Sequence, residues 1–112
     1  MKIAIPLAGG KLSAHFGHCE EFAIIIVVPA SNTVSSREDV APPPHEPGLF
    51  PKWLAERGAT HIIAGGMGQS ARNLFARNHI EVVVGAPEDS PEKIAALYLE
   101  GKLRTGENIC DH

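Results

Sequence analysis

The first third of the chain contains three stretches with the polar and apolar pattern of β-strands. Lys2–Leu7 and Phe22–Val28 are almost continuously apolar, whereas Thr33–Val40 is largely polar and charged. A continuous apolar run is typical of a strand that is buried on both faces. A charged strand suits the edge of a sheet, which meets water. The pattern therefore predicts a first strand at Lys2–Leu7, a buried strand at Phe22–Val28 and an edge strand at Thr33–Val40.

Beyond a proline-rich loop over residues 41–48, the apolar period changes to that of helices alternating with short strands. The run 49–57 has helical spacing, and Gly58 ends it. Ser90 and Pro91 mark the start of the last helix, because a serine side chain caps backbone N–H groups and proline suits the first helical position. The predicted elements of this part are helix 49–57, strand 61–64, helix 69–78, strand 80–84 and helix 91–100.

The order β-β-β-α-β-α-β-α predicts an α/β fold with a mixed five-stranded sheet. Strand–helix–strand crossovers join parallel strands and are right-handed. The first, fourth and fifth strands then run parallel, and the second lies antiparallel beside the first. Counted along the chain, the expected order across the sheet is 3-2-1-4-5, a ribonuclease-H-like three-layer layout with helices on the faces. A length of 112 residues favours one domain, which we expect over residues 1–101, followed by a polar tail over 102–112.

Metal-binding residue types collect in loops that this topology brings to one end of the sheet. The loop after the first strand contains His15, His18 and Cys19, and the proline loop contains His45. The turn Gly65–Gly68 follows the fourth strand. Ligands of open α/β sheets bind beyond the carboxyl ends of the strands, near a reversal of strand order. We therefore expect these loops to meet in one site.

The loop between the first two strands offers nitrogen and sulfur ligands. Its two imidazoles and one thiol suit a borderline or soft metal. The spacing is not that of a zinc finger, because a second half with matching Cys or His pairs is missing. The alternative is that His15 and His18 are solvated and that Cys19 is buried at the start of the second strand. The sequence leaves both interpretations open, as it does for Cys110 and His112 near its end.

The glycine-rich turn offers a second kind of contact. Glycines let backbone N–H groups approach a ligand, and the N-terminus of the following helix favours negative charge. Arg72, in the first turn of that helix, would add a donor. The alternative is a tight architectural turn in which Met67 belongs to the core. A regulatory module that binds a phosphate or nucleotide here is a second functional hypothesis, although the lysine and hydroxyl of a P-loop are missing.

Charge and composition argue against several classes of protein. A net charge of −3 is unlike the basic field of a duplex nucleic-acid binder. The longest apolar run, Phe22–Ala30, is too short to cross a bilayer, so we expect a cytoplasmic protein without a membrane partner. Nucleases of similar layout need clustered carboxylates, but the first and fourth strands contain no Asp or Glu. We therefore expect no enzymatic activity and no nucleic-acid partner.

Three features in this order resemble the nitrogenase iron–molybdenum cofactor accessory family. They are the motif Ser13-x-His15-Phe16-Gly17-His18-Cys19, the proline loop before Trp53-Leu54, and Gly65-Gly66-Met67-Gly68 with Ala71. The resemblance covers residues 1 to 101, nearly the whole chain.

This resemblance implies a small protein that binds or carries a metal–sulfur cluster. The cluster would be of the iron–molybdenum, iron–sulfur or molybdenum–copper sulfide type, held by a monomer that exchanges it with a donor or acceptor protein. The expected metal-ligating residues are His15, His18, Cys19 and His45. The expected contacts to the rest of the cluster come from Phe16, Gly17, Gly65, Gly66, Met67, Gly68 and Arg72.

Overall fold

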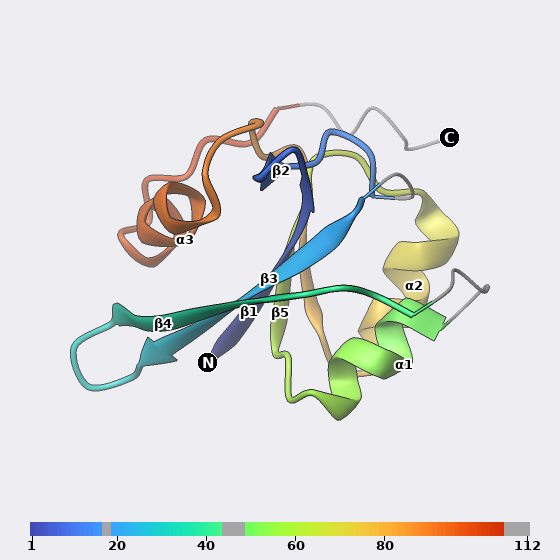
Figure 1. The fold of residues 1–112 in the computed structure, drawn as a ribbon, viewed down its shortest axis with the longest axis horizontal. Coiled ribbons are helices and arrows are strands. Elements are labelled where there is room, and N and C mark those ends of the chain that lie inside the picture. Colours follow the sequence, from blue (N-terminus) through green and yellow to red (C-terminus); the bar gives the residue numbers. More distant parts are fainter. Residues whose placement is uncertain (17–18, 44–48, 107–112) are drawn as a thin grey trace.

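The computed structural model describes residues 1–16, 19–43 and 49–106. Its strands are β1 (Lys2–Ala8), β2 (Lys11–Leu12), β3 (Glu21–Val28), β4 (Thr33–Val40), β5 (His61–Ile63) and β6 (Glu81–Val83). Its helices are α1 (Leu49–Glu56), α2 (Gln69–Arg77) and α3 (Pro91–Leu99). The elements and their arrangement are drawn in Figure 1. In the described part of the chain, none of these helices has both the length and the apolar content to cross a membrane.

The strands form one mixed sheet with the order β4-β3-β1-β5-β6. β3 pairs antiparallel with both β1 and β4, whereas β1, β5 and β6 run parallel. The five longer strands thus stand in the order that the sequence pattern predicts. The expected number of strands is wrong, because the sheet has a sixth strand, β2, which pairs antiparallel with the end of β1.

A two-residue turn produces the additional strand. Leu7 pairs with Leu12 and Ala8 with Lys11, so only Gly9 and Gly10 lie between the two strands. Their φ angles are 62° and 81°, in the left-handed region that glycine adopts at little cost. A two-residue turn with both φ angles positive matches the twist of a β-hairpin. The chain therefore reverses tightly at the carboxyl end of β1 before it enters the loop that contains His15.

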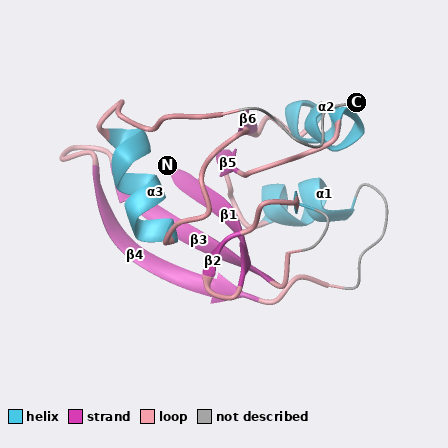
Figure 2. Cartoon of the chain, turned by 90° about the horizontal axis from the view of Figure 1, so that it is seen from above, coloured by secondary structure: helices cyan, strands magenta, loops and turns pink. Residues whose placement is uncertain are grey.

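Helices cover both faces of the sheet, with α3 on one side and α1 and α2 on the other, as Figure 2 shows. Each face has its own apolar core. Alternation along β3 divides its residues between them: Phe22 and Ile24 face α1 and α2, while Ala23 and Ile25 face α3. Burial of apolar surface on both faces is the dominant stabilising contribution to such a three-layer fold.

The prediction that Phe22–Val28 is buried on both faces holds only for the first part of β3. Ile26 and Val28 are 36% and 39% exposed. The reason is visible in Figure 1, where the β3–β4 hairpin extends beyond the region that α1 and α2 cover. On that face the end of the hairpin has no helix over it.

The predicted start of the last helix is confirmed. The Ser90 side chain accepts a hydrogen bond from the Lys93 backbone N–H at 3.4 Å, and Pro91 is the first residue of α3. The chain does not leave the domain after α3. Leu103 packs against the core on the α3 side, and the Gly106 N–H donates to the carbonyl oxygen of Gly85 at 2.7 Å. Residues 102–106 therefore return along the domain toward the carboxyl ends of the parallel strands.

Candidate functional site

The loop after β2 is joined directly to the glycine turn after β5. His15 and Gly66 form a parallel β-bridge. The Gly66 N–H donates to the carbonyl oxygen of Ala14 at 2.6 Å, and the Phe16 N–H donates to the carbonyl oxygen of Gly66 at 2.9 Å. These bonds confirm that two of the predicted motifs meet at the carboxyl end of β1 and β5. They also show that the N–H of Gly66 is used within the protein.

Ser13 fixes the conformation of the same loop. It is buried, with 4% of its surface exposed. Its hydroxyl donates to the His15 carbonyl oxygen at 2.8 Å and accepts from the His15 N–H at 3.4 Å. A serine that bonds the backbone two residues later is a recurrent turn-forming arrangement. Sequence reasoning gave Ser13 no separate role, although its position two residues before His15 is the signal.

Position 65 has to be a glycine because the backbone of another segment packs closely against it. The backbone conformation of Gly65 itself would not require glycine. A Cβ atom at Gly65 would lie 2.8 Å from the carbonyl oxygens of both Ser13 and Ala14. The residues with positive φ are elsewhere, for example at Gly85. The turn thus has glycine at this position because the loop that holds His15 packs on its backbone.

Backbone hydrogen bonds also connect the glycine turn after β5 to neighbouring segments at this end of the sheet. The Gly85 N–H donates to the carbonyl oxygen of Gly65 at 2.6 Å. Gly85 has a φ of 81°, and a Cβ atom there would overlap the Gly106 carbonyl. Three glycines, Gly65, Gly85 and Gly106, therefore connect the end of β5, the end of β6 and the returning chain.

The His15 side chain is exposed at this end of the molecule. Its backbone is held on both sides, by Ser13 and by the bridge to Gly66. An imidazole on such a fixed backbone is suited to ligate a metal or to donate a hydrogen bond to a sulfide.

Cys19 is half-buried against the core, and its backbone N–H donates to the Phe16 carbonyl oxygen at 3.3 Å. Burial raises the pKa of its thiol from 9.0 to about 11. A thiol with so high a pKa stays protonated at neutral pH, and the thiolate is the form that binds metals. Cys19 is therefore a weaker ligand than its place in the motif suggests.

Phe16 and Met67 lie in the core beneath the site. Met67 is 1% exposed and Phe16 is 7% exposed. The Phe16 ring packs against Phe75, Phe50 and Phe22 with centroid distances of 5.5, 5.9 and 6.1 Å. Both side chains anchor the two motifs to the core, which is the alternative that the sequence left open for Met67.

The N-terminus of α2 follows the turn directly. Gly68 is its N-cap, so no side chain caps the helix, and the first turn has no acidic residue. The Arg72 N–H donates to the Gly68 carbonyl oxygen at 3.1 Å, while the Arg72 guanidinium lies 3.5 Å from the Gln69 side-chain oxygen. The positive end of the helix dipole therefore has no side-chain carboxylate in its first turn to offset it, an arrangement that favours an anion.

Part of the predicted ligand set lies outside the described residues. These are the predicted metal ligands His18 and His45. The predicted cluster contact Gly17, and Cys110 and His112, whose role the sequence leaves open, also lie outside the described residues. Within the part of the chain that the structure describes, no three His, Cys, Asp or Glu side chains are grouped so that they could hold a metal ion. His15 and Cys19 are the members of the predicted set that the structure places.

The chain matches the family model described as dinitrogenase iron-molybdenum cofactor over residues 1–101. It is 30% identical over 113 residues to the uncharacterized protein MJ0580 of Methanocaldococcus jannaschii, an alignment that covers 96% of this chain and 92% of that protein. The crystal structure of PH0822 superposes with a TM-score of 0.87 at 26% identity and covers 96% of both chains.

The apo form of the orange protein from Desulfovibrio gigas is also similar. Its TM-score is 0.74 at 20% identity, with 96% of this chain and 93% of that chain covered. At 20% identity, this similarity shows only that the two proteins share a fold.

Proposed function

Because the chain belongs to the dinitrogenase iron-molybdenum cofactor family, we propose that it binds a metal–sulfur cluster as cargo and carries it without transforming it. The observation that carries the proposal is the pairing of His15 with Gly66. This pairing sets an exposed imidazole beside the turn that leads into the N-terminus of α2, at the end of the sheet where α/β folds bind ligands.

The chemistry of these groups suits a cluster better than a bare metal ion. A metal–sulfur cluster brings sulfide ligands of its own and needs few from the protein. Its negative charge is favoured by the helix N-terminus. One imidazole, together with a helix N-terminus that no side chain caps, is consistent with such cargo. A closed ion site would instead need about four protein ligands.

His15 is the primary ligand in this proposal, and Cys19 is secondary. The Cys19 thiol must lose a proton before it can bind, and its raised pKa opposes this loss. Met67 and Phe16 contribute by holding the loop and the turn against the core rather than by touching the cargo.

We further propose that the sheet and helices have a ribonuclease-H-like layout. In this proposal the protein acts in the cytoplasm as a monomer, and it exchanges its cargo with a donor or acceptor protein. We place no catalytic step at the site, since β1 and β5 contain no carboxylate. The cargo is an iron–molybdenum, iron–sulfur or molybdenum–copper sulfide cluster.

Anaerobic titration followed by visible absorption tests the proposal. The probes are isolated iron–molybdenum cofactor, a preassembled iron–sulfur cluster, and tetrathiomolybdate mixed with cuprous salt. We expect at least one to bind and to give a charge-transfer band. His15→Ala should weaken this binding, whereas the control His79→Asn should not. His79 is an exposed histidine at the opposite end of the sheet, and asparagine tolerates its φ of 61°.

Failure of all three probes to bind the wild-type protein would contradict the proposal. Binding of inorganic phosphate or ATP in their place would instead support a phosphate- or nucleotide-binding module.

A further inference from the structure

A groove of about 360 Å³ lies between α3 and the start of β4. It is at the end of the sheet away from His15, because the neighbouring end of β3 pairs with the beginning of β1. Its lining residues include Asn32, Val34, Glu92, Ala96, Leu99 and Glu100. Three of them belong to α3 and Glu100 is its C-cap, and the four recur at intervals that place them on one side of the helix. We call this feature the α3–β4 groove.

The α3–β4 groove is braced at both ends. At one end the Asn32 side-chain amide donates to the Leu99 carbonyl oxygen at 2.9 Å. At the other end Arg37 of β4 is ion-paired with Glu92 of α3, and its Nε lies 2.7 Å from an Asp39 carboxylate oxygen. A helix and a hairpin joined at two points hold the space between them open, so a ligand would find the groove already formed.

The groove runs beside the open edge of the sheet. β4 is the outermost strand on this side, and its pairing with β3 leaves its other edge without a partner strand in the described sheet. The register of β4 shifts next to Val34, between the partners of Ile26 and Val27. An open edge presents backbone donors and acceptors to which another extended chain can add as a strand.

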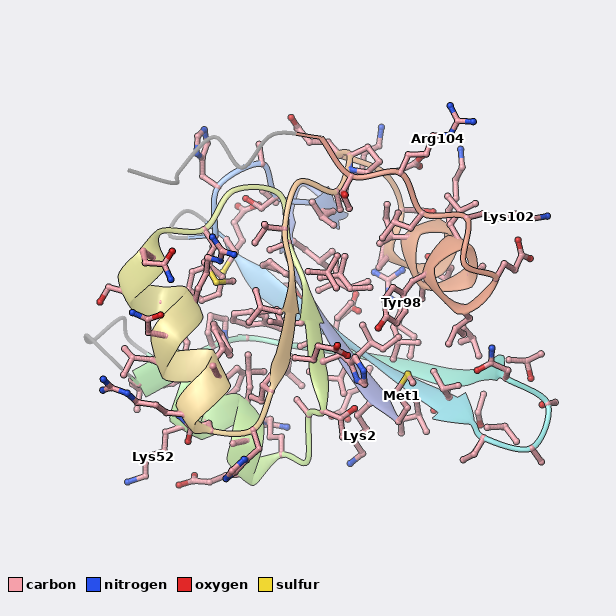
Figure 3. The ribbon with its side chains drawn as sticks, turned by 180° about the vertical axis from the view of Figure 1, so that it is seen from behind. Met1, Lys2, Lys52, Tyr98, Lys102 and Arg104 are labelled. Carbon is pink, nitrogen blue, oxygen red and sulfur yellow. The ribbon has the colours of Figure 1, made fainter. Side chains whose placement is uncertain are left out.

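The charges around the groove are mainly negative. Glu92 in the first turn of α3 and Glu100 at its C-cap are eight residues apart, about 12 Å along the helix axis. Asp39 lies beside Arg37. The Arg37 guanidinium thus pairs with the carboxylates of Glu92 and Asp39, and Glu100 adds a third carboxylate at the other end of the groove. The nearby basic side chains of Lys102 and Arg104 point away from the hairpin in Figure 3.

We propose that the α3–β4 groove docks an extended basic segment of another protein. The segment adds a strand to β4, seats an apolar side chain against Val34, Ala96 and Leu99, and places basic side chains near Glu92 and Glu100. Apolar contact between flanking charges is the usual composition of a peptide-docking surface. This inference goes beyond the proposed function, and its test needs no cluster.

Amide chemical shifts of the isotope-labelled protein, titrated with a short peptide of alternating lysine and valine, test the inference. We expect shifts that concentrate at residues 32–37 and on α3. Glu100→Lys should weaken binding about tenfold, since it replaces an attraction by a repulsion. Ala96→Trp should abolish binding by filling the groove. The matched control is Glu56→Lys, an exposed acid at the end of α1, which makes the same charge change away from the groove.

Several results would overturn the inference. These are no binding by the wild-type protein, equal binding by Glu100→Lys and Glu56→Lys, shifts spread over other acidic surfaces, or equal binding of a peptide with glutamate in place of lysine. Sedimentation of the protein alone as a dimer that Ala96→Trp disrupts would assign the groove to a second copy of this chain. Circular dichroism of each variant confirms that it is folded.

Discussion

The backbone of His15 is bound to the backbone of Gly66, in a parallel bridge between a loop and a turn that are distant in sequence. The candidate site depends on this relationship, because it joins an exposed imidazole to the segment that begins α2. Perturbing either side of the bridge should therefore change cluster binding without removing any ligand.

Replacing Gly65 by alanine tests the close approach at the turn. The new Cβ atom would lie 2.8 Å from two carbonyl oxygens of the His15 loop, so the loop must move. We expect a loss of about 1–3 kcal/mol in the free energy of unfolding and weaker cluster binding. Urea denaturation and anaerobic titration measure the two effects.

Gly106→Ala is the control for this substitution. Its nearest atom would be the Gly85 carbonyl oxygen at 3.8 Å, an ordinary contact. A Gly65→Ala protein as stable as the control, with wild-type affinity, would show that the loop does not depend on this contact.

Removing the Ser13 hydroxyl tests how the His15 backbone is held. Ser13→Ala loses two hydrogen bonds within a buried turn. We expect a cost of about 1 kcal/mol, together with faster amide exchange at residues 14–16. Ser36→Ala, at an exposed position of β4, should change neither quantity. Unchanged exchange in Ser13→Ala would mean that the bridge alone orders the loop.

The raised pKa of Cys19 predicts a pH dependence of stability. The thiol has a pKa of about 11 in the folded protein, against an ordinary value of 9.0. Above the unfolded pKa the unfolded chain ionises while the folded protein stays neutral, so stability falls as the pH rises from 9 toward 11. Urea denaturation over this range should show a steeper fall for the wild-type protein than for Cys19→Ala. Parallel curves would contradict the burial of the thiol.

His61 provides a prediction for the opposite end of the sheet. Its Nε2 lies 2.8 Å from a Glu81 carboxylate oxygen, its Nδ1 lies 2.8 Å from the Thr60 hydroxyl, and its ring packs at 5.8 Å on Tyr98. These contacts connect β5, β6 and α3. We expect His61→Ala to lower the free energy of unfolding by about 1–2 kcal/mol and to leave cluster affinity unchanged. If a folded His61→Ala protein bound the cluster more weakly, the conclusion that His61 has a structural role would be wrong.

Much of the fold could be predicted because the apolar runs of β1 and β3 and the helical spacing after residue 48 are strong local signals. The strand β2 was missed because two residues have no periodicity of their own. Gly9 and Gly10 were the available signal, since adjacent glycines suit a two-residue hairpin turn.

The site was harder to predict than the fold. The sequence placed the His15 loop and the glycine turn at one end of the sheet, but not their hydrogen bonds, which depend on tertiary packing. The glycines suggested backbone open to a ligand, whereas Gly65 and Gly66 contact the loop itself. Phe16 and Met67 lie in glycine-rich segments without periodicity, so nothing in the pattern distinguished core from site.

X-ray absorption at the metal edge of the cluster-loaded protein is the most direct test of the central claim, that His15 ligates the cargo. We predict the scattering pattern of an imidazole bound to the metal in the wild-type protein and in His79→Asn, and its loss in a folded His15→Ala protein. Identical spectra for the wild-type and His15→Ala proteins would contradict the claim.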